Sequence, residues 1–482
     1  MDRREERGAA RTAEPEAAHP PGVFVEGDLR GHVISMSLAG SVGLMAIFLV
    51  DLADLFFISL LGQTELAAAI GYAATVIFFT MAVSIGLAIA VSAMLSRALG
   101  EGQVERARLW ASHGLAVAML TALVVGLLVW ANALALIEVI GAEGETARLG
   151  AGFLAIVAPS LPLTAAMMCS SAILRSHGAA RRAMWVTLSS AAVNGVLDPI
   201  FIFGLGLGLD GAAWATVASR AASAAVGVWL ILRFHGGFAP IRWSALAPDL
   251  RPLAAIAGPA MATNVATPVG VAFVTRMMAE FGDAAVAGNA IVMRLTPVAF
   301  GFVFALSGAI GPIIGQNYGA QKYDRVRETL REAVMVLAVY VVAASALLYV
   351  LSGVIIAGFG AEGEAARLIT WFCGPLSLLF FFNGVLFATN AAFNNLGRPL
   401  TSTMLNWGRH TLGVVPFALG GAALFGAPGA LLGQLAGGIA FALLALWLAH
   451  RLVDQHAAGA AQKSDLPPLW RLPNWPAASP KD

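Results

Sequence analysis

The sequence predicts an all-α polytopic membrane protein of about twelve transmembrane helices, arranged as two homologous six-helix lobes related by a pseudo-two-fold axis along the membrane normal. Its 482 residues are 59% hydrophobic and 12% charged, whereas soluble domains carry about 25% charged residues. Apolar runs of membrane-spanning length follow one another from about Val33 to His450. A long internal repeat divides the chain into halves.

Clusters of Gly, Pro and charged residues separate the apolar runs and mark the connections. The expected spans lie near residues 33–61, 66–97, 109–137, 148–175, 182–204, 211–234, 252–280, 284–317, 327–357, 365–394, 399–424 and 428–450. Several exceed the minimum of about 20 residues that crosses a bilayer, so we expect tilted helices.

Five segments follow from these spans. We expect residues 1–30 to form a disordered tail rich in charge, Ala and Pro, and residues 452–482 to form a Pro-rich tail. Between them lie an N-terminal lobe (31–235), a linker (236–251) and a C-terminal lobe (252–451). Arg and Lys gather at the even-numbered connections and in both tails, so the positive-inside rule predicts that both termini and the linker are cytoplasmic.

The repeat is visible in two places. GAEGETARL at Gly141–Leu149 returns as GAEGEAARL at Gly360–Leu368, and LGEGQVERAR at Leu99–Arg108 returns as YGAQKYDRVR at Tyr318–Arg327. Both matches are 219 residues apart. An even number of spans per half gives the two halves the same orientation in the membrane.

A carboxylate lies inside the fifth span, in the stretch NGVLDPIFIFGLGLGLDGAAWAT that begins at Asn194. Burying Asp198 at this depth costs about 3 kcal/mol, so it marks an ion pathway more often than an aspartate that neighbours merely satisfy. Asn194 lies one turn earlier on the same face. Pro199 lacks an N–H and leaves the Gly195 carbonyl without its helical partner.

Asp54 on the first span and Thr216 on the sixth lie at a depth similar to that of Asp198, about 8–12 Å inside their external loops. We therefore expect Asp54, Asn194, Asp198 and Thr216 to form one site for a proton or another monovalent cation. Asp51, one turn from Asp54, is a second-tier candidate, because two like charges this close disfavour joint ionisation.

The second half provides an internal control for the carboxylates. Val274 corresponds within a residue to Asp54, and Val415 corresponds to Asp198 once a small indel in the repeat is allowed. A carboxylate needed only to fold a half should occur in both halves. The asymmetry indicates a function confined to the first lobe.

Other chemistries lack their motifs. The chain has no GxxxxGK[ST] loop for ATP and no His or Cys spacing typical of a metal centre, so we expect no cofactor and no metal, apart from Na⁺ at the carboxylate site. Cys169 and Cys373 lie in apolar segments and are expected to be inert. A net charge of +1 gives no reason to expect nucleic-acid binding. Arg294, Arg409 and His410 lie deep in the second half, and the sequence names no partner for them.

Two stretches, ADLFFISLLG at Ala53–Gly62 and NGVLDPIFIFGLGLGLDGAAWAT, resemble the MATE (multidrug and toxic compound extrusion) family, most closely its DinF-like branch. The resemblance covers about residues 30–450. It implies a V-shaped pair of lobes and a first-lobe cation site, which would comprise Asp54, Asn194, Asp198 and Thr216 in this chain. It also implies a multi-pass protein of the bacterial inner membrane that acts as a monomer among membrane lipids.

We therefore expect a secondary multidrug antiporter that exports amphiphilic organic cations in exchange for protons or Na⁺. One alternative is a flippase for lipids or lipid-linked saccharides, which would need cationic residues to hold a pyrophosphate. A second alternative is an intramembrane enzyme, for which His410 beside Arg409 is the only candidate pair. ATP-driven transport is not expected.

The charge bias predicts the topology directly. A reporter domain fused after Gly208 should lie on the periplasmic side of the membrane. Reporter domains fused after Gly102 or Gly236 should lie on the cytoplasmic side, because loops rich in Arg and Lys are retained at the inner face. A paired alkaline phosphatase and fluorescent-protein assay measures this. A cytoplasmic signal at Gly208 would contradict both the span order and the depth comparison.

Overall fold

The computed structural model describes residues 22–59, 64–241 and 243–458, and all regular structure in this part is helical. The first lobe comprises α1 (Leu29–Ser59), α2 (Thr64–Gly100), α3 (Val104–Ala131), α4 (Ala133–Val139), α5 (Gly144–Val157), η1 (Ala158–Ser160), α6 (Leu161–Ser176), α7 (Ala180–Pro199), η2 (Ile200–Gly204) and α8 (Gly208–Phe234).

The second lobe begins with α9 (Trp243–Ala279), so helix occupies part of the segment expected to be a linker. It continues with α10 (Asp283–Gly319), α11 (Tyr323–Gly358), α12 (Gly363–Trp371), η3 (Phe372–Leu376), α13 (Phe380–Asn395), α14 (Pro399–Gly408), η4 (Arg409–Gly413), α15 (Val414–Phe425), α16 (Ala427–Ala436) and α17 (Ile439–Ala457).

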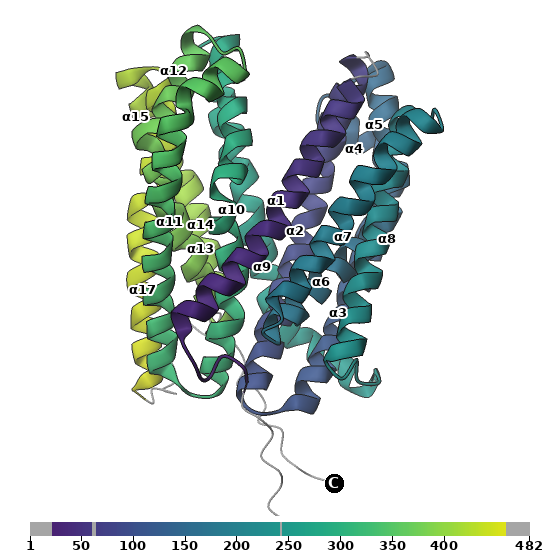
Figure 1. Ribbon diagram of the computed structural model, residues 1–482, viewed down its shortest axis with the longest axis vertical. Helices are drawn as coiled ribbons and strands as arrows, with labels where there is room; N and C mark the ends of the chain where they lie inside the picture. Colours follow the sequence, from purple (N-terminus) through teal and green to yellow (C-terminus); the bar gives the residue numbers. More distant parts are fainter. Residues whose placement is uncertain (1–21, 60–63, 242, 459–482) are drawn as a thin grey trace, which may run out of the picture.

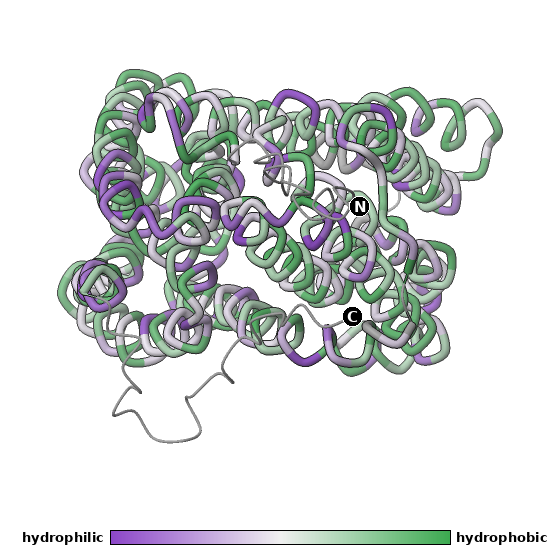
Figure 2. The backbone as a smooth tube through the Cα atoms, turned by 90° about the horizontal axis from the view of Figure 1, so that it is seen from below, coloured by the Kyte–Doolittle hydropathy of each residue, from purple (hydrophilic) through white to green (hydrophobic). Residues whose placement is uncertain are grey.

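The two lobes form a V (Figure 1). They lie close together at the end where the described chain starts and finishes, and they diverge toward the opposite end, near α5 and α12. Viewed from the closed end, most of the outer helices are hydrophobic and hydrophilic residues concentrate at helix ends and connections (Figure 2). This is the distribution that a surrounding bilayer requires.

The all-α, two-lobe membrane fold predicted from sequence is confirmed, with a difference in the number of spans. In the described residues, ten helices are long and apolar enough to cross a membrane, or eleven if the pair Gly363–Leu376 and Phe380–Asn395, bent by 62°, counts as one. The remaining expected span, near 399–424, forms α14, η4 and α15. Arg409 and His410 in its middle make it less apolar than the others.

The repeat recurs in the backbone. α5 and α12 begin at Gly144 and Gly363, which are 219 residues apart and both have a left-handed φ, +57° and +55°. At the α2–α3 connection Gly102 has φ +75°, and its counterpart at the α10–α11 connection, Gln321, keeps the left-handed region at φ +57° without being a glycine. The two lobes therefore share their turns as well as their helices.

Each lobe's first helix packs on the second helix of the other lobe: α1 on α10, and α9 on α2. At the closed end α2 and α10 also meet each other through two glycines. A Cβ on Gly100 would overlap the carbonyl oxygen of Gln316, and a Cβ on Gly319 would overlap that of Arg97. Because these four positions exchange under the 219-residue repeat, the pseudo-two-fold axis passes between the two helices here.

This crossing predicts a position-dependent effect of adding one methyl group. Gly100→Ala should destabilise the protein by about 1–3 kcal/mol, because the lobes must move apart to admit the Cβ. Gly353→Ala on α11, where a Cβ meets open space, should be neutral or stabilising, because alanine favours helix. Thermal unfolding of both variants in the same detergent measures the difference, and equal melting temperatures would contradict the tight crossing.

Candidate functional site

Three of the sequence-predicted site residues meet between α1 and α7. The Asn194 amide nitrogen donates to both carboxylate oxygens of Asp54, at 3.0 and 3.2 Å, and to Oδ2 of Asp198 at 2.6 Å. Asn194 and Asp198 are one turn apart on α7, and α1 packs along this helix. One amide group therefore bridges two carboxylates from two helices.

The bridge is shielded from solvent on the α7 side. Asp198 is fully buried and Asn194 is 5% exposed, whereas Asp54 is half-buried. Because both carboxylates contact the same nitrogen, their bonded oxygens are at most about 6 Å apart. Two negative charges at this separation repel, so a proton or a monovalent cation held between them relieves an electrostatic cost.

One carboxylate oxygen has unused capacity. Oδ1 of Asp198 is buried and has no hydrogen-bond partner among the described residues. A buried acceptor left in this way is costly. It can be satisfied by protonation of the carboxyl group or by a bound cation, and oxygen ligands suit hard cations such as Na⁺.

Pro199 ends α7 directly after Asp198. The chain continues as a wide π-helical turn, η2, over Ile200–Gly204. A proline cannot donate to the preceding turn, so the regular helical ladder stops at this point. The break lies beside the carboxylates, as the sequence indicated.

Thr216 is less closely tied to this group. The Thr216 hydroxyl donates to the Ala212 carbonyl of its own helix at 3.0 Å, and no hydrogen bond links it to the carboxylates in the described part of the chain. This back-bonding is common for threonine in helices. The Asp51 side chain lies outside the described residues.

In the second lobe, the position that corresponds to Asp54 is packed in an apolar core. Val274, the counterpart of Asp54, is 1% exposed and belongs to the apolar core of the second lobe. The two lobes therefore share a backbone plan but differ in this polar group.

Two arginines have roles that the sequence analysis did not identify. Arg220 on α8 is 8% exposed and donates to the Val157 carbonyl at 3.3 Å and the Ser160 hydroxyl at 2.9 Å. It stabilises the short 3₁₀ turn η1 between α5 and α6. Its signal was an arginine at membrane depth, which needs an internal partner.

Arg175, in the last turn of α6, lies at the interface between the lobes. It is half-buried at the end of α6. Its Nε is 3.7 Å from where a Cβ on Gly308 of α10 would be. No ion pair or hydrogen bond joins its guanidinium to another described residue.

The three second-lobe residues without a predicted partner differ in environment. Arg294 is exposed. Arg409 and His410 are 7% and 5% exposed in η4, and Nε of Arg409 and both ring nitrogens of His410 lack hydrogen-bond partners among the described residues. No group of three potential metal ligands from His, Cys, Asp and Glu occurs in the described ranges.

Comparison with known proteins defines the class. The MatE family model matches residues 41–200 and 259–419, one match in each lobe. The chain therefore belongs to the MatE family, and it is a multi-pass membrane transporter and not an enzyme.

Particular relatives match over nearly their whole length. An FAD transporter of Shewanella oneidensis is 28% identical, over 89% of this chain and 96% of that protein. The multidrug export protein MepA of Staphylococcus aureus is 22% identical, over 88% and 94%.

Solved structures agree with the fold. The chain superposes with a TM-score of 0.84 on a MATE structure in complex with MaL6, at 20% identity, covering 90% of this chain and 98% of that one. It superposes with a TM-score of 0.83 on a mutant of the Vibrio cholerae MATE transporter VcmN, at 23% identity, covering 91% and 98%.

The bridging amide yields a prediction for stability. Asn194→Ala should destabilise the protein by about 1–3 kcal/mol, because both carboxylates lose a donor. Asn264→Ala on α9, whose amide bonds only to its own helix at 2.8 Å, is the matched control. Thermal unfolding of both variants measures the effect, and equal losses in the two would contradict the bridging role of the Asn194 amide.

Proposed function

We propose that this transporter exports small amphiphilic organic cations in exchange for protons or Na⁺, and that Asp54 and Asp198 couple the two movements. The observation that supports the proposal is the pair of carboxylates bridged by Asn194, one of them fully buried with a spare oxygen. The second lobe has valines at the corresponding positions, which argues against a merely structural role.

The coupling follows from electrostatics. A proton crossing 100 mV supplies about 2.3 kcal/mol, and each unit of pH difference adds about 1.4 kcal/mol. When the site faces the outside, cation binding neutralises the carboxylates. The apolar helices around them can then close on a neutral cluster, and a cationic substrate loses its electrostatic attraction and is released. Placement in a bacterial inner membrane with cytoplasmic termini gives the driving force the correct direction.

The decisive variant is Asp198→Asn, which imitates the protonated residue. It should insert normally, because an amide costs less than a charge in the membrane, yet abolish ion-coupled transport. Asp54→Asn should behave similarly, and the double variant should be little worse, because the two groups act as one unit. Asp210→Asn, which alters an exposed carboxylate at the start of α8, is the control.

Transport of ethidium into inside-out proteoliposomes, with ΔpH and ΔNa⁺ imposed separately, provides the measurement. Ethidium-induced proton release from purified protein tests the coupling group directly. Undiminished release from Asp198→Asn would show that this residue is not the coupling group. A response to only one of the two gradients identifies the coupling ion.

A second candidate substrate class is supported by one relative and one residue. The relative is named as an FAD transporter, and FAD carries a pyrophosphate. Arg175 places a cationic group between the lobes, and guanidinium binds phosphate oxygens in a bidentate manner. For this candidate, FAD should compete with ethidium, and Arg175→Gln should weaken the competition while the exposed Arg181→Gln does not. Absence of competition by FAD would leave organic cations as the favoured class.

A further inference from the structure

The segment that precedes α1 is held by the other lobe. The main chain of residues 24–27 lies against the ends of α10 and α11. Nη2 of Arg325 donates to the carbonyl oxygens of Phe24, Glu26 and Gly27, each at 3.1 Å. The Phe24 amide donates to Oε1 of the buried Gln316 at 2.9 Å. The start of the first lobe is therefore anchored on the second.

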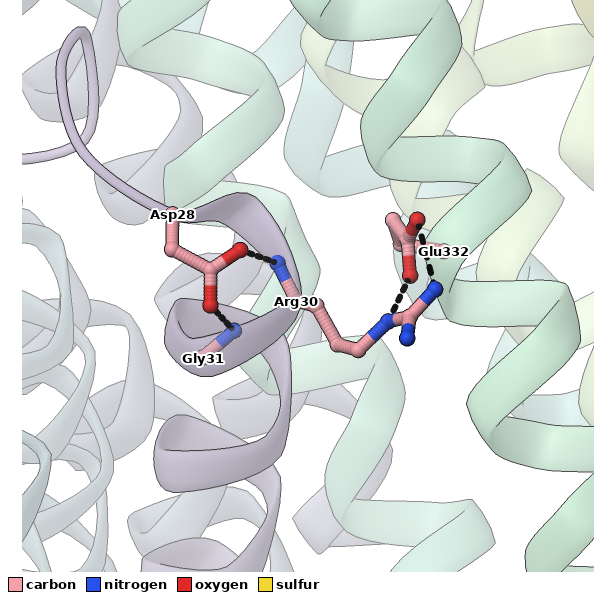
Figure 3. Close-up of polar contacts among 4 residues, drawn as sticks. All are labelled: Asp28, Arg30, Gly31 and Glu332. Atoms are coloured by element: carbon pink, nitrogen blue, oxygen red, sulfur yellow. Dashed lines mark hydrogen bonds and ion pairs between the residues drawn. The ribbon is translucent and has the colours of Figure 1, made fainter.

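The first turn of α1 adds an ion pair between the lobes (Figure 3). Nε and Nη2 of Arg30 donate to the two carboxylate oxygens of Glu332 on α11, at 2.7 and 3.3 Å. Asp28 caps the helix by accepting from the backbone amides of Arg30, at 3.2 Å, and Gly31, at 2.9 Å. The cap fixes the helix start from which Arg30 extends.

A second ion pair holds the first turns of α9 on the first lobe. Asp249 accepts from Nη2 of Arg106 at 2.9 Å and is 2.7 Å from Nδ1 of His113, both on α3. Asp249 and His113 are 5% and 1% exposed. Each lobe's leading helix is thus tied to the third helix of the opposite lobe.

The two ties are equivalent under the repeat, with the charges exchanged. Residues of the two ties occupy equivalent positions, 219 residues apart. On the leading helices, Arg30 corresponds to Asp249. On the third helices, His113 corresponds to Glu332 and Arg106 corresponds to Arg325. In one tie the cation is on the leading helix, and in the other the anion is. Both members differ between the halves, yet each tie keeps a carboxylate paired with an arginine of the other lobe, Glu332 with Arg30 and Asp249 with Arg106. Mere packing at these positions would not require this.

We propose that these two ties are paired latches that keep the lobes closed at the end carrying the termini, and that both must open for the site to face that side. In the described state the lobes diverge only at the opposite end, and transport by two lobes around one site requires that each end open in turn. The first latch belongs to α1, which also carries Asp54. Neutralisation of Asp54 can thus shift α1 as a rigid helix. Such a shift would pull on the ion pair of Arg30 and Glu332 at the other end of α1. The proposal requires two-lobe transport and does not depend on the identity of the ion or the substrate.

A charge-reversal cycle tests the first latch. Ser176 is fully buried and its carbonyl accepts from Gln316 of the other lobe at 2.7 Å. In a Cys169→Ala/Cys373→Ala background, Ser176→Cys therefore reports opening at this end through its rate of labelling by an impermeant maleimide in inside-out vesicles. Arg30→Glu and Glu332→Arg should each raise the rate severalfold, because attraction becomes repulsion. The double variant should return it to the background rate.

The controls separate a latch from a general loss of stability. Glu364→Arg reverses a half-buried charge that pairs with Arg367 on the same helix, far from the closed end, and it should leave the labelling rate unchanged. Glu332→Gln removes the attraction without adding repulsion and should raise the rate to a smaller extent, so it provides a measurement even if a reversal impairs folding. Asp249→Asn should open the second latch in the same assay. Rates in the double variant as high as in the single variants, or no change in any of them, would overturn the proposal.

Discussion

The close crossing of α2 and α10 is the constraint on which the rest of the molecule depends. Gly100 and Gly319 allow each helix to reach the backbone of the other, and no other residue type leaves that space. The contact fixes the pseudo-two-fold axis at the closed end. In the described state the lobes are held together there and diverge at the opposite end. The V shape is a consequence of a tight contact at one end between helices far longer than the contact itself.

Buried polar and charged side chains in the membrane-spanning helices need partners inside the protein. Most of the interior is apolar, and two polar exceptions in the first lobe have internal partners: Asn194 bridges two carboxylates, and Arg220 binds the turn between α5 and α6. Because hydrocarbon cannot solvate these groups, each needs an internal partner or a transported ion. Asp198, with one oxygen unpartnered, is the group for which an ion is the natural partner.

α1 connects these features. It carries Asp54 near one end and Arg30 at the other, about 36 Å apart along the helix, and it packs on α7 of its own lobe and on α10 of the other. In the mechanism proposed above, a helix shared in this way transmits a local electrostatic change as a movement of a rigid element. The carboxylate site and the contacts at the closed end are therefore parts of one mechanical unit.

The sequence by itself determined the helical membrane class, the two-lobe repeat and the candidate carboxylates, because hydropathy, repeat spacing and the cost of a buried charge are local properties. It did not show that Asn194 bridges both carboxylates, that Thr216 bonds to its own helix, or that Arg175 faces the other lobe. The ties of Arg30 to Glu332 and of Asp249 to His113 join residues more than 130 positions apart. Only the tertiary structure decided these, because which side chains meet depends on how helices cross, and no local pattern encodes the crossing.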